Sequence, residues 1–207
     1  MVIIGIAASL SEDLRVGDVA IATQVDLYLE AGKASGNEME FSIAPGGSAY
    51  QAPRELVDLI GNWEFADVSA FSSWQEQCRR RLSEIEGLER EAFVTEGLLR
   101  EVPGLHECQV ASGPLVGASN AFSDWLRRRE RQYKVLEMES GGAMASAYER
   151  TEPKRTMVLR GISDYGDERK TQLDKVGGGV LRRLGMQNAT AFLFSLLTSG
   201  ALSNIVR

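Results

Sequence analysis

The chain has 207 residues, 43% of them hydrophobic, and carries a formal net charge of -6 at pH 7. This size is sufficient to bury one substantial core, so we expect a single globular domain over residues 1–207. The acidic balance disfavours a nucleic-acid partner, because binding the phosphate backbone requires a clustered basic surface. Arginine runs at 79–81 and 127–129 lie beside carboxylates, which favours solvated helix faces over a phosphate or partner site. No apolar stretch reaches the roughly 20 residues that span a bilayer, so we expect no membrane partner.

Cysteine and histidine are scarce in this chain. Cys78 and Cys108 are far apart in sequence, which predicts reduced thiols in a cytoplasmic protein. The only histidine, His106, lies two residues from Cys108, and one such pair without further ligands is a poor zinc site. We therefore expect neither a metal nor a cofactor. The single histidine and the lack of a Gly-x-Ser-x-Gly motif also disfavour a serine hydrolase.

The first fifty residues predict two strands and a long connection. Val2–Ile6 is apolar and reads as a buried strand, and the small residues Ala7 and Ala8 after it allow a ligand to approach closely. Residues 16–25 contain a turn dipeptide and then an apolar run, which predicts a second strand. Residues 31–52 are rich in Gly, Ser and Pro, which predicts a long irregular connection that serves as a lid or binding loop or is disordered.

The middle of the chain alternates between helical and strand patterns. Residues 53–60 begin with a proline suited to a first helical turn, and residues 73–85 form a second, charge-rich helical pattern. Residues 109–116 predict a third strand that ends in Gly-Pro. Residues 123–133 predict a helix with Ser123 as its N-cap.

Two later strands end in polar residues. Residues 133–137 predict a short strand, and alternation would place Glu137 and Glu139 on one face and Met138 on the other. Small residues then open a helix. Residues 157–162 form an apolar run that favours a strand covered on both faces.

The second of these strands is followed by a cluster of hydroxyl and carboxyl groups. Ser163 and Asp164 come first, and open α/β sheets bind ligands at such strand ends. A Ser-Asp pair after a strand is by itself more often a turn or a helix cap. We interpret Tyr165, Asp167 and Lys170 as solvated loop residues.

The C-terminal part has apolar residues at helical spacing from 173 to 197. This pattern predicts one interrupted helix or two short ones, with Gly185 as the break. The triplet at 177–179 disfavours helix locally and leaves the start of the last helix open.

Taken in order, these segments resemble the nucleoside phosphorylase and nucleosidase superfamily, particularly the methylthioadenosine/S-adenosylhomocysteine nucleosidase branch. The resemblance is carried by Gly5–Leu10 followed by Val16–Val19, by Ser112–Gly113, by Glu137–Glu139 and by Arg160–Asp164. It spans most of the chain. It implies a three-layer αβα sandwich around a central mixed, largely parallel sheet, and a homo-oligomeric assembly.

The resemblance also implies roles for individual residues. Asp164 would be the general acid that protonates or hydrogen-bonds a purine ring nitrogen, and this requires a carboxyl group that keeps its proton near neutral pH. Ser163 would orient the base. Glu139 would bind the ribose hydroxyls and favour an oxocarbenium-like transition state, with Met138 packed on the sugar and Glu137 assisting on the same strand.

Four further residues are expected to contact the substrate. Val116 and Gly117 would lie near the base, at a place where relatives often have an aromatic side chain. Ala7 and Ala8 would line the site from the first strand. The missing aromatic leaves adenine specificity open.

Two departures from the family pattern bear on the reaction. Phosphorolytic relatives hold phosphate with Arg and Ser where this chain has Ile3 and Ile6, which favours hydrolysis over phosphorolysis. The family's opening strands, with the glutamate that activates water, have no counterpart before Met1, so the domain is N-terminally incomplete relative to the family. Glu38 or Glu40 is a candidate replacement for that glutamate.

The leading hypothesis is an N-glycosidase that hydrolyses a purine nucleoside or nucleotide. The alternatives are a catalytically impaired nucleoside-binding or sensor domain of a larger protein, a phosphate-dependent phosphorylase, and, more weakly, a structural or oligomerisation domain. The apolar segments at 63–65 and 71–74 are candidate interface surface or core.

Overall fold

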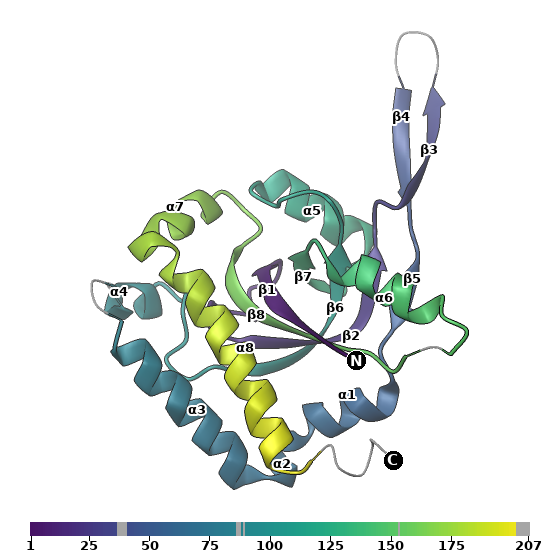
Figure 1. The fold of residues 1–207 in the computed structure, drawn as a ribbon. Helices are drawn as coiled ribbons and strands as arrows, with labels where there is room; N and C mark the ends of the chain where they lie inside the picture. Colours follow the sequence, from purple (N-terminus) through teal and green to yellow (C-terminus); the bar gives the residue numbers. More distant parts are fainter. Residues whose placement is uncertain (37–40, 86–87, 89, 153, 202–207) are drawn as a thin grey trace.

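The computed structural model describes residues 1–36, 41–85, 88, 90–152 and 154–201. Its elements follow one another along the chain as shown in Figure 1. They are β1 (Val2–Ser9), β2 (Val19–Leu27), β3 (Ala31–Gly36), β4 (Phe41–Gly46), β5 (Ala49–Gln51), α1 (Arg54–Gly61), α2 (Trp63–Ala66), α3 (Val68–Ser83), α4 (Arg90–Thr95), β6 (Leu105–Ser112), α5 (Asn120–Arg129), β7 (Tyr133–Glu137), α6 (Ser140–Tyr148), β8 (Met157–Tyr165), α7 (Lys170–Lys175), the 3-10 turn η1 (Val176–Gly178) and α8 (Val180–Thr198).

Six strands form the central sheet in the order β5-β2-β6-β7-β1-β8, and a further pairing of β2 with β8 closes it. The pairs β1–β8, β2–β6 and β6–β7 are parallel, whereas β1–β7, β2–β5 and β2–β8 are antiparallel. The expected mixed α/β class is confirmed. The sheet differs from the expected largely parallel one, because it is closed and half of its pairings are antiparallel.

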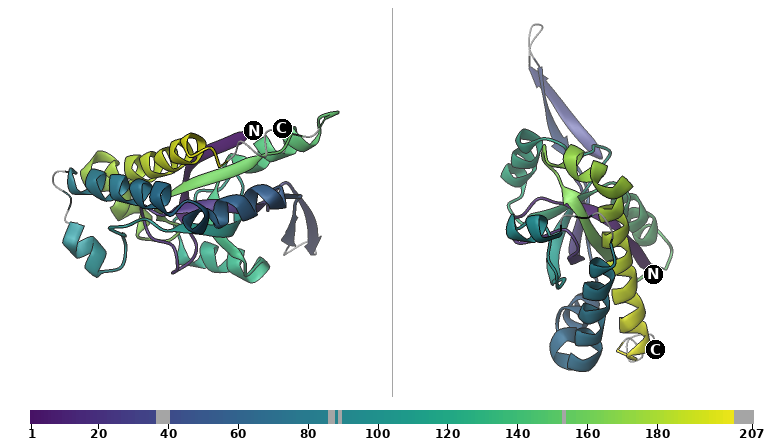
Figure 2. Two further views of the ribbon diagram at one scale, coloured as in Figure 1. Left: turned by 90° about the horizontal axis from the view of Figure 1, so that it is seen from below. Right: turned by 90° about the vertical axis from the view of Figure 1, so that its left-hand side faces the viewer.

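Helices cover the sheet, and the largest helical contact is made by α8. This helix packs along β8 and β1, and α3 packs beside it, as Figures 1 and 2 show. The rings of Trp63 and Trp74 lie with their centroids 5.3 and 5.1 Å from that of Phe192. Of the two apolar segments at 63–65 and 71–74, Trp63, Phe71 and Trp74 therefore belong to the core, whereas Phe65 is 74% exposed.

The segment 31–52 is not the irregular connection that its composition predicts. It forms the β3–β4 hairpin, which projects from the body of the molecule, and β5, which joins the sheet edge beside β2 (Figure 1). Every residue of β3 is exposed, so the strand lacks the apolar alternation that would identify it. The guanidinium of Arg129 donates to the carbonyl oxygen of Pro45 at 2.6 Å. The candidates Glu38 and Glu40 lie outside the described residues.

The expected N-cap of α5 is wrong. This helix begins at Asn120, with Ser119 preceding it, and Ser123 is buried within it. The Ser123 hydroxyl donates to the carbonyl oxygen of Gly166 at 2.5 Å, which ties the helix to the segment after β8. The helix predicted from residue 73 begins earlier, at Val68, where Asp67 accepts a hydrogen bond from the backbone of Ala70 at 3.0 Å.

The break in the C-terminal helical region is at 177–179 and not at Gly185. Gly177, Gly178 and Gly179 have φ values of 51°, 62° and 85°, a left-handed backbone conformation that residues other than glycine rarely adopt. Gly185 lies inside α8, where it packs directly on Gly161 of β8. A residue without a side chain fits at this position because the helix and the strand approach each other closely there.

Both cysteines are free and buried. Burial raises the pKa of the Cys78 thiol to about 12, and that of the Cys108 thiol to about 12 as well. His106 lies with its Nε2 atom 3.2 Å from the buried carboxylate of Asp18. Within the described ranges there is no group of three or more His, Cys, Asp and Glu side chains that could hold a metal ion. The same part of the chain contains no helix long and apolar enough to cross a membrane.

The contact between Gly161 and Gly185 predicts a stability defect. A Cβ atom at Gly161 would overlap the carbonyl oxygen of Gly185, so we expect Gly161→Ala to lower the free energy of unfolding by about 1–3 kcal/mol. Gly142 is the matched control, because a Cβ there meets no atom within 4 Å among the described residues. Gly142→Ala should be neutral or stabilising by up to about 1 kcal/mol. Urea unfolding measures both, and a parental midpoint for Gly161→Ala would contradict the packing argument.

Candidate active site

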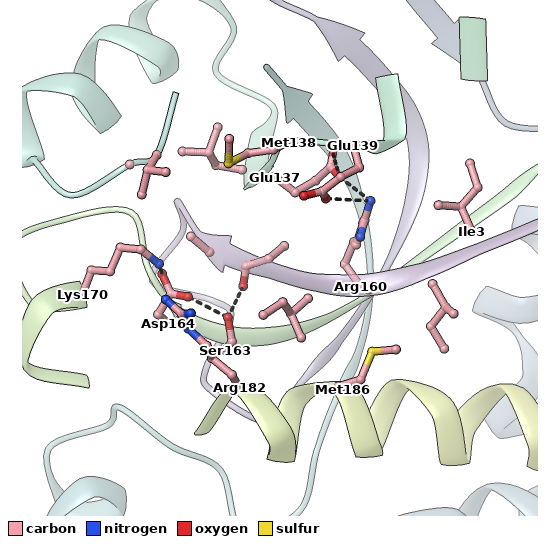
Figure 3. A pocket seen from close by; sticks show the side chains of 18 of the residues that line it. Ile3, Glu137, Met138, Glu139, Arg160, Ser163, Asp164, Lys170, Arg182 and Met186 are labelled. Atoms are coloured by element: carbon pink, nitrogen blue, oxygen red, sulfur yellow. Dashed lines mark hydrogen bonds and ion pairs between the residues drawn. The ribbon is translucent and has the colours of Figure 1, made fainter. Parts of the chain in front are cut away.

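One pocket of about 760 Å³ gathers every residue that the sequence analysis assigned to a site. β1 forms one wall, and the other walls come from the ends of β7 and β8, from the segment after β6, and from α7 and α8 (Figure 3). The nine assigned residues that line it are Ala7, Ala8, Val116, Gly117, Glu137, Met138, Glu139, Ser163 and Asp164.

The pocket opens where β1 separates from β7. These strands pair only through Ala8 with Leu136 and Ser9 with Val135. The consecutive residues Ile3–Ala8 all line the pocket, although successive side chains of a strand point to opposite faces. The pocket therefore faces the edge of β1, and the small side chains of Ala7 and Ala8 leave that edge accessible.

A β-bulge places Ser163 and Asp164 side by side. In the register between β1 and β8, Ala7 pairs with Ile162 and Ala8 pairs with Asp164, so Ser163 is the extra residue. The Ser163 hydroxyl donates to Oδ2 of Asp164 at 2.6 Å and lies 3.3 Å from the carbonyl oxygen of Ala7. Both side chains are almost fully buried, with 2% and 3% exposure.

Lys170 completes this end of the pocket. Its Nζ atom donates to Oδ1 of Asp164 at 2.6 Å, and the lysine side chain is only 14% exposed. Both oxygens of Asp164 thus accept hydrogen bonds in this arrangement (Figure 3). The interpretation of Lys170 as a solvated loop residue is wrong, because α7 begins with it and directs it into the pocket.

The two other residues interpreted as solvated lie outside this pocket. Tyr165 is buried, and its hydroxyl donates to the carbonyl oxygen of Leu98 at 2.9 Å, so that interpretation is also wrong. Asp167 is paired with Arg169, whose guanidinium lies 4.0 Å from the centroid of the Tyr165 ring.

The opposite end of the pocket is organised around the buried side chain of Arg160. Its guanidinium donates to Glu137 and to the hydroxyl of Ser140, and it packs on Gly5 of β1, where a Cβ atom would overlap it. Glu137 also accepts from the backbone N–H groups of Glu139 at 3.0 Å and Ser140 at 2.9 Å. The cluster therefore joins β1, β7, β8 and the first turn of α6.

Glu139 and Met138 lie at the mouth of the pocket, just beyond the end of β7. An oxygen of Glu139 is 3.6 Å from Arg160, and the glutamate side chain is 71% exposed. Glu137 reaches Arg160 from the last residue of β7, and Glu139 reaches it from beyond the strand. Met138 lines the same pocket as well, because the strand ends at Glu137 and its alternation does not continue.

The two residues expected near the base, Val116 and Gly117, lie in the connection between β6 and α5. Val116 is exposed and Gly117 is buried against Leu136 and Gly166. Sequence reasoning missed four lining residues of this pocket that the last two helices supply: Lys170, Arg182, Arg183 and Met186. They lie outside the matched motifs. Arg160 was noted only as part of a motif, and its buried pairing with Glu137 was not predicted. The signal that could have predicted it is a single arginine within an otherwise apolar run.

The Arg160–Glu137 pair predicts a large and partly reversible loss of stability. We expect Arg160→Met to lower the free energy of unfolding by about 3–5 kcal/mol, because it leaves the buried Glu137 charge without its cation. Adding Glu137→Gln should restore part of the loss. Urea unfolding of the two single variants and the double variant measures the coupling, and strict additivity of the two losses would refute it.

Comparison with known proteins identifies the fold. No family model matches the sequence, and no curated protein matches it. Among solved structures, futalosine hydrolase of Helicobacter pylori has 19% identity and a TM-score of 0.57, and the match covers 96% of this chain and 67% of that one. A 5'-methylthioadenosine/S-adenosylhomocysteine nucleosidase from Neisseria meningitidis, in complex with methylthio-immucillin-A, has 18% identity and a TM-score of 0.57 over 96% and 68% of the two chains.

A third such structure, a nucleosidase of the same name from Colwellia psychrerythraea in complex with adenine, has 15% identity and a TM-score of 0.58, and covers 95% of this chain and 65% of that one. These matches extend over nearly the whole of this chain and about two thirds of each neighbour. The chain therefore shares its fold with futalosine hydrolase and with these 5'-methylthioadenosine/S-adenosylhomocysteine nucleosidases.

Proposed function

We propose that this chain is an N-glycosidase that hydrolyses a purine nucleoside or nucleotide in the pocket described above. The observation that carries the proposal is the buried Ser163–Asp164 pair, which faces the Glu137–Glu139 segment across the pocket. The fold supports it, because neighbours with this fold are nucleosidases, and one is in complex with adenine.

In this proposal the base lies at the Asp164 end and the sugar lies near Glu139 and Met138. The bond between C1' of the sugar and N9 of the purine breaks, and its electron pair moves onto the base. A proton delivered to a ring nitrogen makes the base a better leaving group. Because Asp164 accepts from Ser163 and Lys170 at its two oxygens, it relays a proton that the Lys170 ammonium supplies. The anionic Glu139 stabilises the positive charge that develops on the sugar. The oxygen of water attacks C1' and its proton passes to the solvent, from which the group that protonated the base regains its own, so the reaction balances.

The lining of the pocket favours hydrolysis over phosphorolysis. Ile3 and Ile6 lie on the β1 wall and offer no donor to a phosphate ion. Among the described residues that line the pocket, the buried guanidinium of Arg160 is already paired with Glu137. Water, which is small and uncharged, suits such an apolar wall better than a phosphate dianion.

A second candidate function is a nucleoside-binding domain without turnover. It is favoured by the pairing of the described carboxylates that line the pocket: Asp164 with Lys170, and Glu137 and Glu139 with Arg160. The two buried carboxylates of the described lining, Asp164 and Glu137, are therefore not free to take a proton from water. The homo-oligomeric assembly, the cytoplasmic location and the N-terminal incompleteness stay predictions.

Asp164 is the residue that tests the proposal. We expect Asp164→Asn to reduce base release at least about 100-fold, because an amide at this position cannot take part in proton delivery. The measurement is release of free base from a panel of purine nucleosides, with and without phosphate. Asp167→Asn is the matched control, since Asp167 lies outside the pocket and pairs with Arg169.

The possible results separate the alternatives. Full activity of Asp164→Asn on every substrate that the parent cleaves would overturn the assignment of the acid. Base release that requires phosphate would indicate a phosphorylase. Nucleoside binding without release would favour the binding domain.

A further inference from the structure

We infer that the pocket selects 6-oxopurines, such as hypoxanthine and guanine, over adenine, with Lys170 as the residue that determines the choice. The inference rests on the proposed function, and it concerns which base that function accepts. It starts from the contact between the Lys170 ammonium and Oδ1 of Asp164.

The edge of a purine that carries N7 and the substituent at position 6 differs between the two classes of base. Adenine presents an acceptor at N7 and a donor at its amino group, whereas guanine presents two acceptors, N7 and O6. Hypoxanthine has the same two acceptors on this edge. A carboxylate with a free oxygen can accept from the adenine amino group, whereas a group that only donates fits the 6-oxo substituent.

In this pocket both oxygens of Asp164 are already used. Ser163 donates to Oδ2 and Lys170 donates to Oδ1, each at 2.6 Å. Each oxygen therefore already holds one donor, and an adenine amino group that approached Oδ1 would be a second donor beside the ammonium. That ammonium has three N–H donors and no acceptor, so two donors are left after the bond to Asp164.

The surroundings add further donors to this end of the pocket. Arg182 of α8 also lines the pocket and lies towards Asp164 in Figure 3, and guanidinium groups only donate. Arg182 is held by Asp174 through two hydrogen bonds of 3.0 and 2.8 Å. An adenine amino group brought here would add a donor where donors predominate, whereas O6 would accept from the ammonium.

The lysine is placed by packed structure. It begins α7, whose Leu173 is buried, and its backbone N–H donates to the carbonyl oxygen of Asp167 at 3.1 Å. Because Lys170 and Asp164 are largely buried, water cannot replace the hydrogen bonds that a mismatched base fails to make with them. A hydrogen bond from a charged donor in such a site carries substantial discrimination between bases.

The experiment compares the two classes of base directly in equilibrium binding. Isothermal titration calorimetry of the full chain with hypoxanthine and with adenine should show hypoxanthine bound about 10- to 100-fold more tightly. Base release from inosine and from adenosine is measured in parallel. Lys170→Met removes the donor while it keeps an unbranched side chain, so adenine binding should strengthen and the ratio should fall towards one or reverse.

Lys175→Met is the matched control, because Lys175 is an exposed residue of the same helix and does not line the pocket. It should keep the parental ratio. Adenine bound as tightly as hypoxanthine by the parent chain would overturn the inference, and so would an unchanged ratio in a folded Lys170→Met. Should that variant fail to fold, the parental ratio decides alone.

The failure of this inference is distinct from the failure of the proposed function. A parent chain that prefers adenine and releases it from adenosine contradicts the role of Lys170 and leaves the N-glycosidase intact. A parent chain that neither binds nor releases any of these bases refutes both.

Discussion

The buried pair of Arg160 and Glu137 is the interaction on which the site depends. Removing two charges from water costs several kcal/mol per ion, so such a pair is tolerated only when its remaining hydrogen-bonding groups are satisfied. Here Glu137 accepts from the backbone at the start of α6, and Arg160 donates to Ser140 in the same turn. The cost of burial is thereby offset by a network that fixes the end of β7 relative to β8.

The same pair explains why a pocket is left at this place. The guanidinium occupies the space beside Gly5, so β1 passes over Arg160 and meets β7 only at its last two residues. Further along β8, the bulge at Ser163 turns two successive polar side chains to one side of the strand. A regular strand would send one of them to the opposite face. The two ends of the pocket, at Asp164 and at Arg160, are thus both set by β8, through one extra residue and one arginine.

The sequence was sufficient for the features that local pattern controls. Residues 157–162 have the composition of a fully buried strand, and β8 is buried along its whole length. Polar residues at two strand ends were expected to come together, and Glu139 and Asp164 do line one pocket. Features that depend on distant contacts were missed. Lys170 lines the pocket because of the path that the chain takes between β8 and α7. Gly185 was expected to break the helix, but it lies within α8, where it allows close packing on Gly161 of β8.

The distribution of charge in the pocket restricts the ligands that it can accept. At the Asp164 end the described side chains are a hydroxyl, one carboxylate and the cations of α7 and α8, so a ligand must present acceptors there. At the other end Arg160 is committed to Glu137, and the exposed Glu139 remains a strong acceptor at the mouth. A ligand must therefore present hydroxyl donors at that end and an apolar middle to Ile3 and Ile6. A purine whose edge accepts hydrogen bonds, joined to a sugar whose hydroxyls donate, meets both requirements, since each end of the pocket supplies the group that the ligand lacks.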